Sequence, residues 1–101
     1  MKMRKNLKFK PNPKRKTITI FKNRWARSKY ADNHGAYCAL GYAGLQLYGE
    51  SDFFAGSKSQ GHPITKIEDE VISVNDNCHG KERINRLRDL FKKAGYRLIF
   101  K

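Results

Sequence analysis

Acidic residues are missing from the first third of this sequence. No aspartate or glutamate occurs from Met1 to Ala31, although this stretch holds twelve of the 22 lysines and arginines. From Asp32 to Lys101, ten basic residues accompany nine acidic ones, so the net charge of +13 lies almost entirely in the N-terminal third. Such a distribution favours a polyanionic partner, nucleic acid above all, because lysine and arginine neutralise phosphates.

Long apolar runs and closely spaced cysteines are also lacking. The longest apolar run, Ala36 to Tyr48, is shorter than the roughly 20 residues that cross a bilayer as a helix. The N-terminus has a charged, proline-containing segment where a secretory signal would have its apolar core. The two cysteines, Cys38 and Cys78, do not form the Cys-x₂-Cys pair typical of structural zinc sites. We therefore expect a cytoplasmic protein with reduced cysteines, no membrane partner, no metal and no cofactor.

The run Ala36–Tyr48 predicts a buried central helix, because Gln46 is its only plainly polar side chain. Gly49 is expected to end this helix, and Asp32 or Asn33 to cap its start.

Two further helices are predicted in the second half of the chain. Thr65 and Glu68 have capping-box spacing, so a helix is expected to begin at Thr65 and to end at Asn75–Asn77. The apolar spacing within Lys81–Ala94 predicts a second amphipathic helix, which Gly95 stops.

Alternating β-branched and aromatic residues predict strands near both ends of the chain. Thr17–Lys22 and Tyr96–Lys101 are expected to lie side by side, and Trp25–Tyr30 is a candidate third strand. The sequence therefore predicts a small single α+β domain over residues 17–101, preceded by a flexible basic arm over residues 1–16. Its sheet would have two or three strands formed by both termini.

The candidate nucleic-acid-binding residues are the basic side chains of the acid-free N-terminal third. They are Lys2, Arg4, Lys5, Lys8, Lys10, Lys14, Arg15, Lys16, Lys22, Arg24, Arg27 and Lys29. Trp25 and Tyr30 stand among the last of them and could stack on unpaired bases, but we expect the single tryptophan to be a core residue. Basic residues of the last helix, such as Arg83 and Arg88, are interpreted as a solvated face.

Two other groups of residues are candidates for chemistry or binding. Cys38 near a helix start, with His34, His62 or His79 as a base, is the pattern of a thiol hydrolase. Because Cys38 lies in an apolar run, core packing is the preferred interpretation. The segment Asn75–Gly80 is interpreted as a capped connection between two helices rather than a binding loop.

Several short motifs together resemble an uncharacterised family of small proteins from phages and actinobacteria. They are Trp25, Ala31-Asp32, Gly35, Cys38-Ala39-Leu40-Gly41, Asn75-Asp76 and Gly80 ahead of an amphipathic helix. The chain differs from this family in its basic arm and strand, which replace an N-terminal helix, and in one extra residue before Gly80. The resemblance implies a shared core pinned by Cys38 and Asn75-Asp76, and a phage origin within a host cytoplasm. The resemblance implies no particular activity for this chain.

The leading hypothesis is a non-enzymatic phage-type accessory protein that binds nucleic acid, or a nucleoprotein complex, without reading sequence. One alternative is an inhibitor that engages an acidic host protein, and another is a thiol hydrolase acting through Cys38. Salt-sensitive binding to generic DNA or RNA separates the first hypothesis from the second. The choice between DNA and RNA and the oligomeric state stay open from sequence.

Overall fold

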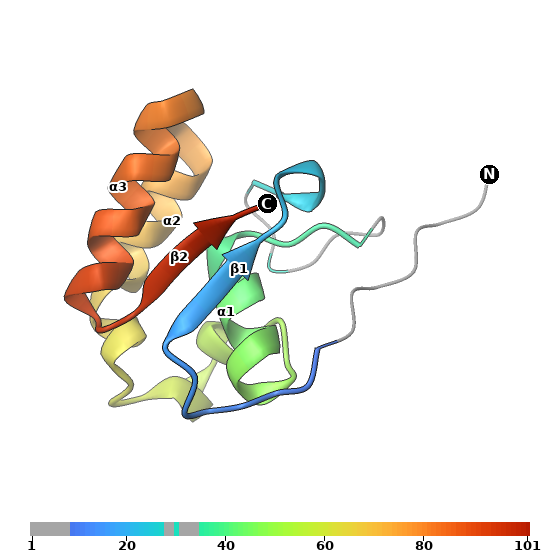
Figure 1. Cartoon of the computed structure of the whole chain (residues 1–101). Helices are drawn as coiled ribbons and strands as arrows, with labels where there is room; N and C mark the ends of the chain where they lie inside the picture. The colour runs from blue at the N-terminus through green and yellow to red at the C-terminus, as the bar shows by residue number, and fades with distance from the viewer. Residues whose placement is uncertain (1–8, 28–29, 31–34) are drawn as a thin grey trace.

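The computed structural model of the chain describes residues 9–27, 30 and 35–101. The main elements, in chain order, are β1 (Thr17–Ile20), α1 (Ala39–Tyr48), α2 (Glu68–Asn77), α3 (Gly80–Lys93) and β2 (Arg97–Phe100). β1 and β2 form a two-stranded sheet, α1 lies behind it, and α2 and α3 pack together at one side (Figure 1). The predicted α+β class, with a sheet formed near both termini, is confirmed.

The two strands are parallel, with Thr17 opposite Arg97 and Ile20 opposite Phe100. Ile18 and Ile20 are fully buried, so the alternating sequence of β1 directs one face of the sheet to the core. Parallel strands require a long crossover connection, and here all three helices belong to it.

The candidate third strand over Trp25–Tyr30 is wrong for the residues that the structure describes there. Only Trp25 pairs, in an isolated bridge to Tyr37. The 3-10 helix Lys22–Arg24 turns the chain away from the sheet, and the indole of Trp25 is held elsewhere by Asn75. Ser28 and Lys29 lie outside the described residues.

The central helix α1 is buried as predicted and ends at Gly49, whose φ of 77° is the left-handed conformation that glycine favours. Its cap was predicted wrongly. Tyr37 is still extended, so the helix begins only at Ala39, and the Cys38 thiol accepts the hydrogen bond from Gly41 N at 3.4 Å. Asp32 and Asn33 lie outside the described residues.

Gln46 explains how a polar residue fits into this buried helix. Its side chain is fully buried and pairs with the backbone of Thr19 on β1. Thr19 N donates to Gln46 Oε1 at 2.9 Å, and Gln46 Nε2 donates to Thr19 O at 2.7 Å. The amide thus satisfies the outer edge of β1 as a neighbouring strand would.

The predicted helix start at Thr65 is also wrong. The chain first forms a 3-10 helix over Pro63–Ile67, in which Ile64 N donates to the His62 side chain at 3.1 Å. The residue that precedes α2 is Ile67, which provides no side-chain cap, and the Thr65 hydroxyl donates to Ser59 O at 2.8 Å. α2 ends at Asn77 as predicted, and α3 lies within one residue of its predicted bounds.

Candidate nucleic-acid interface

The pairing of β1 with β2 joins two segments of the chain that contain no acidic residue. Residues 9–27 and 94–101 carry nine lysines and arginines and no aspartate or glutamate. Four acidic residues are instead on α2, which packs against α3 and α1. The parallel sheet therefore extends the acid-free N-terminal third with two basic residues from the opposite end of the chain, Arg97 and Lys101.

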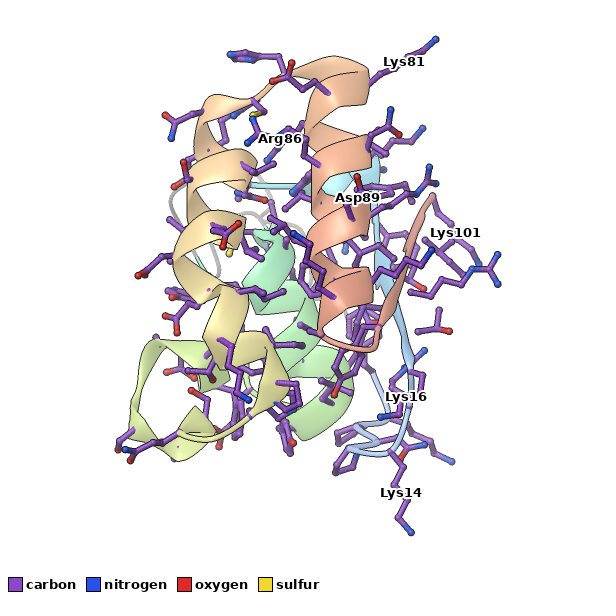
Figure 2. The ribbon with its side chains drawn as sticks, turned by 90° about the vertical axis from the view of Figure 1, so that its left-hand side faces the viewer. Lys14, Lys16, Lys81, Arg86, Asp89 and Lys101 are labelled. Carbon is purple, nitrogen blue, oxygen red and sulfur yellow. The ribbon has the colours of Figure 1, made fainter. Side chains whose placement is uncertain are left out.

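The exposed basic side chains of these two segments form what we call the basic surface. Its members are Lys10, Lys14, Lys16, Lys22, Arg97 and Lys101. Figure 2 shows Lys14, Lys16 and Lys101 along the side of the molecule where the strands lie. Each of these side chains is exposed, and neither segment contains an aspartate or glutamate, so this part of the molecule has a positive potential.

The structure places seven of the twelve candidate residues. Lys10, Lys14, Lys16 and Lys22 are exposed, whereas three arginines are half-buried. The remaining five lie outside the described residues, and they are Lys2, Arg4, Lys5, Lys8 and Lys29. Among the half-buried arginines, Arg15 donates from Nε to Thr17 O at 2.9 Å, and Arg24 lies at the turn that follows β1.

Arg27 has contacts that indicate a structural role. Its guanidinium donates to the backbone oxygens of Asn75 at 3.0 Å, Asp76 at 2.7 Å and Cys78 at 2.9 Å. These carbonyls end α2, where a positive charge also complements the helix dipole. We therefore assign Arg27 to the helix end and leave it out of the basic surface.

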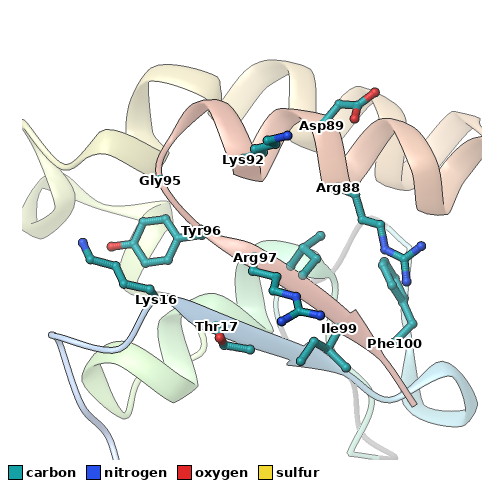
Figure 3. Close-up of a pocket in the computed structure, with 11 residues that line it drawn as sticks. Lys16, Thr17, Arg88, Asp89, Lys92, Gly95, Tyr96, Arg97, Ile99 and Phe100 are labelled. Atoms are coloured by element: carbon teal, nitrogen blue, oxygen red, sulfur yellow. The ribbon is translucent and has the colours of Figure 1, made fainter.

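A groove of about 870 Å³ runs between α3 and the sheet and continues the basic surface. Lys16, Arg88, Lys92 and Arg97 line it, with Asp89 as the one acidic lining residue (Figure 3). Arg88, Lys92 and Arg97 were missed as candidate residues. The alternation of Tyr96–Lys101 separates Arg97 from the apolar side chains of the strand and is a signal that could have found it, but only the packing of α3 beside β2 brings it near Arg88.

The aromatic rings of the groove already have partners. The centroids of the Phe100 and Trp25 rings are 5.1 Å apart, and the Arg88 guanidinium lies 5.3 Å from the centroid of the Phe100 ring. Tyr96 stacks on His62, and Lys16 Nζ lies 5.4 Å from the centroid of the Tyr96 ring. Base stacking would have to displace these contacts, so the groove favours phosphate neutralisation over base stacking.

Trp25 and Arg83 pack against the core and are not part of the basic surface. Trp25 Nε1 donates to Asn75 Oδ1 at 2.7 Å, as expected for a tryptophan packed against the core. The interpretation of Arg83 as a solvated residue is wrong, because its side chain is buried with the guanidinium 3.4 Å from the Trp25 ring centroid. Burial, followed by the neighbouring charge of Arg27, lowers the pKa of Arg83 to about 10.

The thiol at the start of α1 lies in an environment that opposes ionisation. Burial raises the pKa of Cys38, although backbone N–H groups of α1 partly offset it. His62 packs among Tyr48, Phe54 and Tyr96, while His79 contacts Arg27, and His34 lies outside the described residues. None of these contacts of His62 and His79 is with the Cys38 thiol, and thiol hydrolysis stays a prediction.

Residues 9–27, 30 and 35–101 contain no cluster of three or more histidine, cysteine, aspartate or glutamate side chains that could hold a metal ion. Nor does any helix formed by these residues have the length and apolar character needed to cross a bilayer.

Comparison of the chain with protein-family models, curated proteins and solved structures finds no match. The resemblance to small phage and actinobacterial proteins therefore stays a prediction.

Proposed function

We propose that this protein binds nucleic acid without sequence specificity, through the basic surface and the adjoining groove. The observation that carries the proposal is the parallel pairing of two acid-free segments, which adds Arg97 and Lys101 to the N-terminal basic residues. Phosphates are the common feature of DNA and RNA, and their neutralisation supplies most of non-specific affinity.

The side chains that line the groove support binding that is independent of nucleotide sequence. Base readout needs side chains that reach base edges or free aromatic faces, and the ring contacts of Tyr96 and Phe100 are already made within the protein. Four mainly exposed cations around the groove offer contacts to a phosphate backbone instead. The N-terminal end of the chain would add further contacts to phosphates through Lys2, Arg4, Lys5 and Lys8.

A salt titration of binding to duplex DNA, single-stranded DNA and RNA tests this proposal. We expect the logarithm of the affinity to fall steeply with the logarithm of the salt concentration, by about 0.9 for each phosphate contacted on duplex DNA. The variant Arg97→Gln/Lys101→Gln should bind more weakly and give a slope smaller by about one to two.

The matched control is Lys66→Gln/Lys81→Gln, which removes the same charge from exposed positions on the helical part of the molecule. It should change the slope less than the sheet variant. Equal losses in the two variants would mean that net charge alone attracts the nucleic acid, and absence of binding at moderate salt would overturn the proposal.

A further inference from the structure

The two edges of the sheet differ in how their backbone groups are satisfied. On β2, Arg97 N donates to Lys16 O at 2.8 Å, and Lys101 N donates to Ile20 O at 2.9 Å. Lys101 O also accepts from Lys22 N at 2.8 Å. In a parallel ladder, alternate residues direct both backbone groups to the same neighbour, so Arg97, Ile99 and Lys101 face β1.

The intervening residues, Leu98 and Phe100, therefore direct their N–H and C=O groups away from β1. Within residues 9–27, 30 and 35–101, no hydrogen bond uses these four groups. The opposite edge of the sheet is closed, because Gln46 pairs with both backbone groups of Thr19. The sheet thus has one covered edge and one open edge.

The open edge of β2 borders the groove between β2 and α3. Leu98 and Phe100 line that groove together with Arg88 and Lys92 of α3 (Figure 3). Its volume of about 870 Å³ lies within the range of binding sites for small ligands. A four-residue strand is about 13 Å long. An extended segment lying there would satisfy the backbone of β2 and place alternate side chains toward α3.

The charges around the edge indicate which segment would occupy it. A second copy of β2 would bring Arg97 and Lys101 against the same residues, so like charges oppose self-pairing. Nucleic acid would contact the cations but has no peptide backbone to continue the ladder. An acidic peptide provides both the backbone groups and the carboxylates that Arg88, Lys92 and Arg97 would pair with.

We propose that the open edge of β2 binds an extended acidic peptide, which adds to the sheet as a third strand. This inference is carried by the backbone geometry of β2 and does not depend on nucleic-acid binding. Because the peptide and a phosphate backbone would share Arg97, an acidic peptide is also expected to compete with nucleic acid.

Amide hydrogen exchange of the full chain, followed residue by residue by NMR, tests the open edge directly. In the free protein, the amides of Leu98 and Phe100 should exchange on the order of tenfold or more faster than those of Arg97 and Ile99. Slow exchange of Leu98 and Phe100 in dilute free protein would overturn the proposal. Protection that grows with protein concentration would instead assign the edge to a second copy.

The probe is a capped peptide of alternating glutamate and valine, added to the same sample. It should slow the exchange of Leu98 and Phe100 and leave Arg97 and Ile99 unchanged. The same peptide with alternate N-methylated residues keeps its charge but cannot extend the ladder, so it should give no protection. Equal protection by both peptides, by duplex DNA or by a lysine–valine peptide, or no effect of the probe at millimolar concentration, would overturn the proposal.

Two variants of α3 separate the contribution of charge. Arg88→Gln/Lys92→Gln should weaken binding of the probe peptide about tenfold or more, because it removes two cations at the groove. Lys81→Gln/Lys93→Gln removes the same charge from exposed positions outside the groove lining and should bind the peptide almost as well as the parent. Equal affinities in the two variants would contradict the proposed position.

Discussion

Asn75 connects three parts of the chain that are distant in sequence. Its Oδ1 accepts hydrogen bonds from Trp25 Nε1 at 2.7 Å and from Ala39 N at 3.1 Å, and its Nδ2 donates to Ala26 O at 3.1 Å. The side chain is 1 % exposed, so water cannot replace these partners. The amide therefore fixes the position of α2 relative to the start of α1 and to the segment that follows β1.

Replacing Asn75 with alanine should lower the free energy of unfolding by about 2–4 kcal/mol, because the indole and Ala39 N–H groups would be left buried without partners. Urea unfolding followed by tryptophan fluorescence measures the change. Asn77→Ala is the control. The Asn77 side chain is exposed and donates to Ser73 O, so its replacement should lower the free energy of unfolding by less than about 1 kcal/mol. Similar losses in both variants would contradict the role assigned to Asn75.

His62 should make the stability depend on pH. Burial, assisted by the positive charge of Lys16, lowers the pKa of His62 in the folded protein. The unfolded chain then binds the proton first, so stability should fall as the pH drops below about 6.5 toward the lower folded pKa. Protonation would also remove the acceptor at Nδ1 that Ile64 N uses.

Urea midpoints measured between pH 7.5 and pH 5 check this dependence. His62→Gln should lose the part of the pH dependence that the imidazole contributes, whereas His79→Gln, which removes an exposed imidazole, should retain it. An unchanged pH profile in His62→Gln would show that other groups cause the acid sensitivity.

At the scale of elements, α1 depends on close backbone contacts rather than on side-chain bulk alone. A Cβ at Gly41 would overlap the carbonyl oxygen of Tyr30, and a Cβ at Gly44 would overlap that of Glu50. The absence of a side chain at these two glycines therefore leaves the space that the two carbonyl groups occupy.

Gly44→Ala should therefore destabilise the protein by about 1–3 kcal/mol, although alanine is the better helix former by about 1 kcal/mol. Thermal unfolding followed by circular dichroism measures the change. Gly56→Ala is the matched control, because no atom lies within 4 Å of its Cβ position and its φ is −124°. An increase in stability in Gly44→Ala would show that the loop carrying Glu50 yields without cost.

At the scale of the whole molecule, positive charges outnumber negative ones by thirteen and gather toward the sheet. Only two ion pairs occur among the described residues, and both are on the surface. Added salt therefore screens more repulsion than attraction.

Raising the salt concentration from about 0.05 M to about 0.5 M should increase the melting temperature by a few degrees. The variant Arg97→Gln/Lys101→Gln should show a smaller increase than the Lys66→Gln/Lys81→Gln control, because it reduces the repulsion where the charges are most concentrated. A melting temperature that falls with salt would mean that attractive pairs dominate.

Local pattern by itself determined the main elements of this protein. The alternation of Thr17–Ile20, the apolar run before Gly49 and the amphipathic spacing of α3 all predict elements that the structure contains. These signals are reliable because they depend on the period of one segment and on its own capping residues. The one-sided charge of the N-terminal third is likewise a property of composition.

Tertiary structure decided what that pattern could not. The parallel partner of β1 sets which basic residues join the N-terminal ones, and packing buries Arg83 against Trp25, although the sequence of α3 alone places it among solvated cations. Likewise, the open edge of β2 and the closed edge of β1 depend on where α1 and α3 lie. Contacts between distant segments depend on long-range packing, and the hydrophobic period of a single segment does not specify which distant segment it will contact.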